Sequence, residues 1–166
     1  MATTRRKLTF ASLGQVMPDV ERLLAGHATA GRWSLGQILH HLALTVRLSV
    51  DGVPEKFPWP VRRLFGPVAR RLSFWLGRIP RGVRVPDAYL PPPGPDAARE
   101  AEALRAAIGR FGGFAGRLDE HPLLGRLSRG QWERFHCLHC AHHLSFAVPA
   151  VPAVPAVRRE GGPAGS

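Results

Sequence analysis

The sequence contains few cysteines and no long hydrophobic run, and these absences exclude two classes of protein. Its two cysteines, Cys137 and Cys140, cannot build a disulfide framework. They form a CxxC motif with no second pair, in the middle of a predicted helix. We therefore interpret them as small buried thiols rather than as a redox or zinc pair. Because no stretch of about 18 uninterrupted apolar residues occurs, we expect no transmembrane helix.

Lysine is also scarce: Lys7 and Lys56 are the only lysines, although the formal net charge is +11. A charge of this size raises the hypothesis of nucleic-acid binding. Alanine, glycine, proline and arginine are all abundant, however, as expected of a GC-rich coding sequence that spreads arginine over the whole surface. No zinc-finger spacing or aromatic-glycine single-strand motif accompanies the charge. We therefore expect no nucleic-acid partner.

The N-terminal segment MATTRRKLTFASLGQ starts with basic residues, but no apolar segment follows them. We therefore expect no signal peptide, and the predicted location is cytoplasmic. The chain of 166 residues is long enough to form one domain with a core of its own.

Four helix starts are marked by capping residues. Ser12, Ser34 and Ser128 are each followed three residues later by Gln, which is the capping-box pattern, and Asp96 is a fourth N-cap. Apolar residues recur near every 3.6 positions after each start, and no alternating strand pattern occurs. The predicted fold class is therefore all-α. The four predicted helices span roughly 13–25, 35–51, 97–118 and 129–147.

The connections between these helices predict the topology. The first and second helices, and the third and fourth, are joined by short loops, so each pair is expected to be antiparallel. The insert at 53–94 is long enough to let the second and third helices run parallel, which gives an up-down-down-up four-helix bundle. We assign residues 1–148 to this bundle, and residues 149–166, rich in Pro and Ala, to a disordered tail.

Two histidines four residues apart, His139 and His143, stack on one face of the last predicted helix, about 6 Å apart along its axis. Two imidazoles at this spacing can hold one ion, as in the helical His-x-x-x-His of zinc enzymes. His41 lies in the second predicted helix, and antiparallel packing against the last helix brings it to the same level. We therefore predict a divalent-metal site formed by His41, His139 and His143. Three protein ligands leave a coordination position open, as in catalytic sites.

The other histidines leave alternatives open. His40 and His142 adjoin the predicted ligands, so the ligand register could be wrong by one residue. His40 shares its side of the helix with residues that look solvated, which favours His41 as the inward side chain. His136 could be a further ligand or could support one. The imidazoles could also be core residues that are satisfied by hydrogen bonds alone. Two histidines in loops are predicted to lie on the surface: His27 and His121.

Two segments carry a resemblance to a known family: WSLGQILHHLALTVRLSVDG and, far downstream, WERFHCLHCAHHLSF. They resemble the DinB-like superfamily of four-helix metal-binding proteins. More narrowly, the chain resembles an uncharacterised branch with a Trp-Ser-Leu-Gly-Gln helix start, a basic insert containing Trp-Pro and a closing His-Leu-Ser-Phe. The resemblance covers roughly residues 8–148. It implies an up-down-down-up bundle whose metal ligands map onto His41, His139 and His143.

The resemblance also implies a range of functions. Members of the superfamily include thiol-cofactor S-transferases, a thiol-dependent isomerase and metal-dependent hydrolases. Their ion is usually nickel, zinc, iron or manganese, and dimers are common. We therefore expect a metal-dependent transferase or hydrolase that acts on a small-molecule substrate, uses a divalent metal ion and in some reactions a low-molecular-weight thiol, and can form a homodimer. The main alternative is a non-catalytic bundle that binds a metal or a small molecule.

Neither histidine motif supplies an obvious general base. Glu133 lies off the buried stripe of its helix, and Asp51 lies far along the second helix. Thr45, one turn beyond His41, could support a metal ligand or could simply pack.

The insert contains a basic amphipathic segment, VRRLFGPVARRLSFWLGRIPRGVR, which Pro67 interrupts. We expect its apolar face to cover one end of the bundle. Its arginines would then face outward, where they could attract an anionic substrate or a thiol cofactor that carries a carboxylate. A membrane-surface adaptor is an alternative function, although a membrane partner is not expected. The arginines between its apolar positions are Arg62, Arg63, Arg70 and Arg71.

Overall fold

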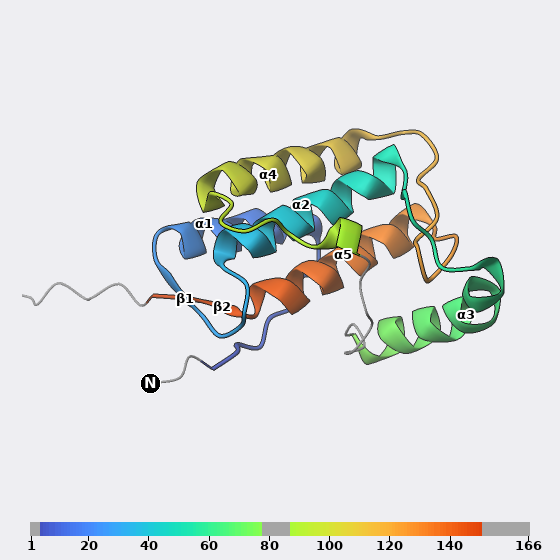
Figure 1. The fold of residues 1–166 in the computed structure, drawn as a ribbon, viewed down its shortest axis with the longest axis horizontal. Coiled ribbons are helices and arrows are strands. Elements are labelled where there is room, and N and C mark those ends of the chain that lie inside the picture. Colours follow the sequence, from blue (N-terminus) through green and yellow to red (C-terminus); the bar gives the residue numbers. More distant parts are fainter. Residues whose placement is uncertain (1–3, 78–86, 151–166) are drawn as a thin grey trace, which may run out of the picture.

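The structure, a computed structural model, describes residues 4–77 and 87–150 and is mostly helical in these ranges. Within these residues, five α-helices, a two-stranded antiparallel sheet and two short 3-10 turns occur (Figure 1). The helices are α1 (Val16–Leu24), α2 (Leu35–Asp51), α3 (Trp59–Leu76), α4 (Ala97–Gly113) and α5 (Arg129–Leu144). The strands are β1 (His27–Thr29) and β2 (Ala147–Pro149), and the turns are Leu13–Gln15 and Asp87–Tyr89.

The predicted caps form at three of the four helix starts. Ser34 and Ser128 make complete capping boxes, and the carboxylate of Asp96 accepts a hydrogen bond from the amide of Arg99 at 2.8 Å. The box predicted at Ser12 is wrong, because its side chain makes no capping bond. Instead the Gln15 side-chain oxygen accepts a hydrogen bond from the amide of Ala11, a 3-10 turn comes first, and α1 begins at Val16.

Two predicted helices end earlier than expected. Helix α4 stops at Gly113, because Phe114 takes an extended backbone and the Arg129 guanidinium binds the carbonyls of Phe111 and Gly112 at 2.7 and 2.6 Å. Helix α5 stops at Leu144, and the chain then forms β2 against β1. This small sheet was not predicted, because each strand has only three residues, too few for an alternating pattern. Residues 151–166 of the predicted tail lie outside the described residues.

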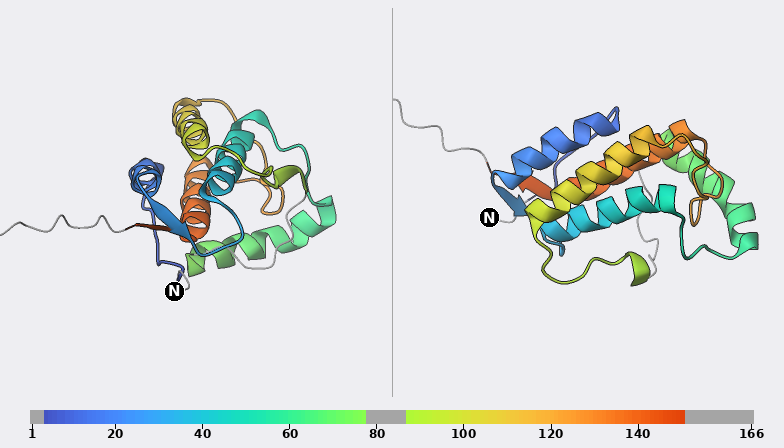
Figure 2. Two further views of the ribbon diagram at one scale, coloured as in Figure 1. Left: turned by 60° about the vertical axis from the view of Figure 1, so that its left-hand side comes forward. Right: turned by 90° about the horizontal axis from the view of Figure 1, so that it is seen from above.

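A single core lies between α1, α2, α4 and α5, and the closest contact is between α2 and α4 (Figures 1 and 2). Gly36 permits this approach, since a Cβ atom there would lie 2.1 Å from the carbonyl oxygen of Pro95. Trp132 of α5 is 2% exposed, and its indole nitrogen donates a hydrogen bond to the carbonyl of Asp119 at 3.1 Å. The largest fully buried aliphatic side chains are Leu23, Leu35, Ile38, Leu39, Leu42, Leu104 and Leu144.

A buried ion pair ties the segment before α1 to the core. Asp19 is 1% exposed and binds the guanidinium groups of Arg6 and Arg22. The backbone amide of Arg6 also donates to the carbonyl of Ser145 at 3.1 Å, just beyond the end of α5. Because a buried carboxylate is costly without partners, this contact fixes α1 and the end of α5 to each other.

Within the insert, residues 59–76 form one continuous helix, α3. The predicted interruption at Pro67 is wrong, because Pro67 lies inside this helix. Proline removes only the hydrogen bond to the carbonyl four residues earlier, and the turns on either side continue. The prediction that the apolar face of this segment covers the bundle is also wrong. Gly66 and Ser73 face the protein, whereas Phe65 and Trp75 are 63% and 80% exposed. Within the described residues, no helix combines the length and apolarity needed to cross a membrane.

Substituting Gly36 with alanine tests the close packing of α2 on the chain before α4. We expect Gly36→Ala to destabilise the fold by about 1–3 kcal/mol, because the added methyl group overlaps the Pro95 carbonyl. Gly109→Ala, on an exposed part of α4 with open space around it, should stabilise by up to about 1 kcal/mol through helix propensity. Denaturant unfolding of both variants measures the difference. Equal stabilisation by the two substitutions would show that the close approach is wrong.

Candidate metal centre

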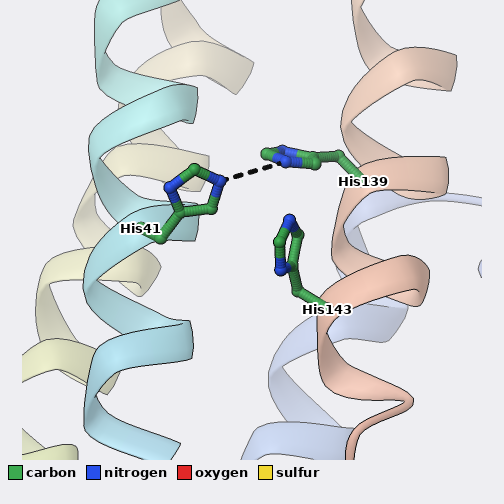
Figure 3. A group of neighbouring side chains, drawn as sticks. All are labelled: His41, His139 and His143. Atoms are coloured by element: carbon green, nitrogen blue, oxygen red, sulfur yellow. Dashed lines mark hydrogen bonds between the residues drawn. The ribbon is translucent and has the colours of Figure 1, made fainter. Parts of the chain in front are cut away.

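Three histidine side chains from two helices converge between α2 and α5 (Figure 3). His41 projects from α2, and His139 and His143 project from successive turns of α5. Each offers one ring nitrogen, and these nitrogens all lie within 4.8 Å of one another. In the described part of the chain this is the one group of three His, Cys, Asp or Glu side chains that could hold a metal ion. The structure thus brings together the three residues that the sequence singled out.

Hydrogen bonding fixes the orientation of His41. Its Nδ1 lies 2.8 Å from the carbonyl oxygen of Tyr89. A carbonyl oxygen only accepts hydrogen bonds, so Nδ1 carries the proton and Nε2 keeps its lone pair. Tyr89 is 5% exposed, and its hydroxyl donates to the carbonyl of Glu55 at 3.1 Å. The crossover between α3 and α4 therefore orients a ring that belongs to α2.

A threonine does the same for His139. The Thr45 hydroxyl donates to the carbonyl of Leu42 at 3.0 Å, so its lone pairs are left to face Nδ1 of His139, which is 3.4 Å away. With the proton on Nδ1, Nε2 of His139 carries a lone pair, and it lies 3.2 Å from Nε2 of His41. The prediction that Thr45 could support a ligand agrees with this geometry, since it contacts His139 directly.

The distance between Nε2 of His41 and Nε2 of His139 fits two ligands of one cation. Two acceptors that face each other at 3.2 Å repel unless something positive lies between them. Nitrogens that ligate one tetrahedral ion at 2.0–2.1 Å lie roughly 3.3 Å apart, close to the observed distance. The donor set is also suitable, because imidazole is a preferred ligand of zinc, nickel and iron.

Burial keeps all three rings uncharged. It lowers the pKa of His41, whose hydrogen bond to Tyr89 and proximity to His40 are smaller influences. Burial, followed by the neighbouring His143, holds the pKa of His139 well below its usual value. Burial and then His41 lower the pKa of His143 to about 2. Metal ligation requires neutral imidazole, so these rings are in the competent protonation state at neutral pH without further change.

One side of the site faces a pocket. This pocket has a volume of about 210 Å³, and His143 is part of its wall. The Trp33 ring stacks on the His143 ring with centroids 5.5 Å apart and planes inclined by 10°, so Trp33 holds the third histidine in position. A small molecule in this pocket would reach the histidine group from the His143 side. The pocket is lined by Gly31, Arg32, Trp33, Ile38, His143 and Phe146.

The other histidines of the two motifs lie outside the group. His40 is half-buried and pairs with the Glu100 carboxylate at 3.1 Å. Nδ1 of His142 lies 3.4 Å from the Arg5 guanidinium. His136 is fully buried, stacks on Trp132 and has its Nε2 3.2 Å from the Ser49 hydroxyl. His136 is therefore placed beside the group, in the core, rather than among the three converging nitrogens.

The surface prediction is right for one loop histidine and wrong for the other. His27 is exposed. His121 packs edge-on against Phe135, with ring centroids 4.4 Å apart, and its Nδ1 accepts hydrogen bonds from the amides of Leu123 and Leu124. Burial lowers its pKa to about 3. The His121 ring thus joins its own loop to Phe135 of α5, and helical periodicity cannot predict such a contact because His121 lies outside the helices.

Sequence reasoning missed Tyr89 and Trp33, because both lie between helices where no apolar period marks them. Tyr89 is the one tyrosine of the chain, and Trp33 directly precedes the Ser34 cap. Cys137 and Cys140 are buried free thiols, as interpreted, and burial raises the pKa of Cys137 to about 11. Among the described residues no carboxylate joins the histidine group.

A family profile described as "Protein of unknown function (DUF1569)" matches residues 2–150, nearly the whole chain. The chain belongs to this family. The match spans every described helix and both strands, so α2 and α5, which carry the histidines, are elements of DUF1569. A comparison with curated proteins and one with solved structures each found no match.

Replacing Thr45 tests how His139 is oriented in this DUF1569 protein. We expect Thr45→Val to weaken zinc binding by about 10–100-fold, because it removes the acceptor that holds the proton on Nδ1. Thr45→Ser keeps the hydroxyl and should bind zinc within a few-fold of the unmodified protein. Competition with a chromophoric chelator measures both affinities. Equal affinities for the two variants would show that Thr45 only packs.

Proposed function

We propose that this DUF1569 protein is a metal-dependent enzyme of the DinB-like type whose divalent ion is held by His41, His139 and His143. The observation that carries the proposal is the pair of Nε2 lone pairs facing each other at 3.2 Å, each on a ring whose Nδ1 faces an oxygen acceptor. Two Nε2 lone pairs that face each other can both bind a cation, whereas in a packed core without a cation they would repel each other.

The arrangement of the helices supports the DinB-like assignment. We propose that α1, α2, α4 and α5 form an up-down-down-up bundle, with α3 in the long crossover. In Figure 1, α2 and α4 start at the same end of the protein, while α5 starts at the opposite end. This is the order in which the second and last bundle helices can share one metal ion at matching heights.

The donor set narrows the choice of ion among nickel, zinc, iron and manganese. Three neutral imidazoles with no carboxylate among the described neighbours favour zinc, nickel or iron, because manganese prefers oxygen ligands. Such an ion, when bound, lowers the pKa of a water or thiol in its open position and so supplies a nucleophile at neutral pH.

The side chains that line the pocket determine which molecules can reach the open coordination position of the ion. Trp33 and Phe146 form apolar walls, and Arg32 supplies a cationic side chain to the lining. The volume of about 210 Å³ suits a small molecule. No carboxylate belongs to the histidine group itself, and a thiol, with a usual pKa of about 8.5, needs less activation there than water does. We therefore favour thiol-dependent transfer over hydrolysis, with a small substrate in the cytoplasm.

Loss of one ligand should remove the metal without unfolding the protein. We expect one zinc or nickel ion per chain in the purified untagged protein, and affinity at least about a hundredfold lower in His143→Ala. His27→Ala, which removes an exposed histidine, should retain the metal. Elemental analysis with circular dichroism measures content and fold together. A metal-free protein that cannot be reconstituted would contradict the proposal.

A second experiment separates an enzyme from a closed binding site. Cobalt substitution should give visible absorption bands, and adding a small thiol should shift them, because a thiolate enters the open position beside His143. Trp33→Leu should alter the thiol affinity while cobalt stays bound, since Trp33 lines the pocket and stacks on His143. Bands that no thiol or small anion changes would favour the non-catalytic alternative.

A further inference from the structure

Helix α3 carries its apolar residues on the side that faces away from the protein. It places Gly66 and Ser73 against the bundle, and Ala69 and Arg62 are half-buried beside them. Five large apolar side chains recur at helical spacing on the opposite side and are 45–80% exposed: Leu64, Phe65, Val68, Leu72 and Trp75. Trp59, the first residue of the helix, is also 66% exposed.

Several contacts fix this outward orientation. A Cβ atom at Gly66 would lie 2.9 Å from the carbonyl oxygen of Leu123, so only glycine lets α3 approach that loop. The Arg62 guanidinium binds the Glu120 carboxylate at 2.6 Å. Arg70 donates to the carbonyl of Arg126 at 3.0 Å. These bonds hold the small and polar side of the helix inward, so rotating the apolar side onto the bundle would break them.

The exposed side is a large apolar surface for a protein of this size. Helix α3 has 18 residues and is therefore about 27 Å long. Five of its apolar positions span an arc of about 100° when placed at 100° per residue, from Leu64 to Phe65 with Trp75 inside it, and Trp59 lies outside this arc at the first turn. Contiguous apolar surfaces of this kind mark interaction sites.

The surrounding charge indicates the type of partner. Arg63 and Arg71 are exposed on one flank of the apolar arc, and the sequence from residue 57 to residue 86 contains no aspartate or glutamate. The whole chain carries a net charge of +11. A second copy of α3 would bring further arginines against these, whereas an anionic lipid surface complements them.

We propose that α3 binds an anionic membrane surface, lying in the headgroup region with its apolar arc inserted. Trp75 within the arc, Trp59 at the first turn of the helix and the arginines on the flank are side chains of the kind that stabilise a helix at this depth. The bundle with its histidine group then stays on the aqueous side, held by the contacts that Gly66 and Arg62 make. This proposal is independent of the metal-dependent activity, because it uses no residue of that site.

Sedimentation of the full chain with lipid vesicles tests the proposal. We expect binding to vesicles of equal parts phosphatidylcholine and phosphatidylglycerol, and little binding to phosphatidylcholine alone. The double variant Leu64→Ser/Trp75→Ser should bind the anionic vesicles at least about tenfold more weakly, because the inserted area is lost. Arg63→Gln/Arg71→Gln should lose about fivefold per arginine at low salt.

A control and a second measurement keep the test decisive. Leu24→Ser, which alters an exposed leucine of α1, should bind as the unmodified protein does. Circular dichroism checks that the variants remain folded, since the replaced side chains are exposed. Equal binding to both vesicle types, or no binding to either, would overturn the proposal. So would a dimer in sedimentation equilibrium that the Leu64→Ser/Trp75→Ser variant abolishes in the absence of vesicle binding.

Discussion

The site depends on one constraint: a buried imidazole must satisfy both of its nitrogens, and a neutral ring can donate from only one. Tyr89 and Thr45 take up the Nδ1 side of His41 and His139, which leaves two lone pairs directed at each other. In a core without a cation this arrangement would be unfavourable, because two acceptors repel in a medium of low dielectric constant. The same arrangement becomes favourable when a divalent ion lies between them.

The rest of the fold keeps these rings at matching heights. Asp19 and its two arginines join α1, the N-terminal segment and the end of α5, so the turn that carries His143 has little freedom. Gly36 lets the start of α2 meet the chain before α4, and the same crossover places Tyr89 over His41. The stability of the bundle and the geometry of the site therefore rest on shared contacts.

The features that the sequence could predict are those that local rules control. Capping at Ser34 and Ser128 and a 3.6-residue period mark α2 and α5, and the His-x-x-x-His spacing places two imidazoles on one face. Helix ends, the small sheet and the orienting contact of Tyr89 depend instead on partners tens of residues away. His121 shows the same limit, since it is half-buried by the aromatic side chains of α5 as well as by hydrogen bonds within its own loop.

Two helices of this chain depart from the usual rule that polar side chains lie on the surface and apolar ones in the core. Helix α5 places histidines inside the protein, and α3 places tryptophan and phenylalanine side chains outside it. Each arrangement costs free energy in the isolated chain, because imidazoles lose hydration in the core and apolar area stays in water on the surface. Such costs persist where something outside the chain offsets them. A cation would do this for the lone pairs of α5, and an anionic lipid surface would do it for the apolar arc of α3. The two proposals made for this protein, a metal ion on α5 and a lipid surface on α3, therefore rest on the same physical argument.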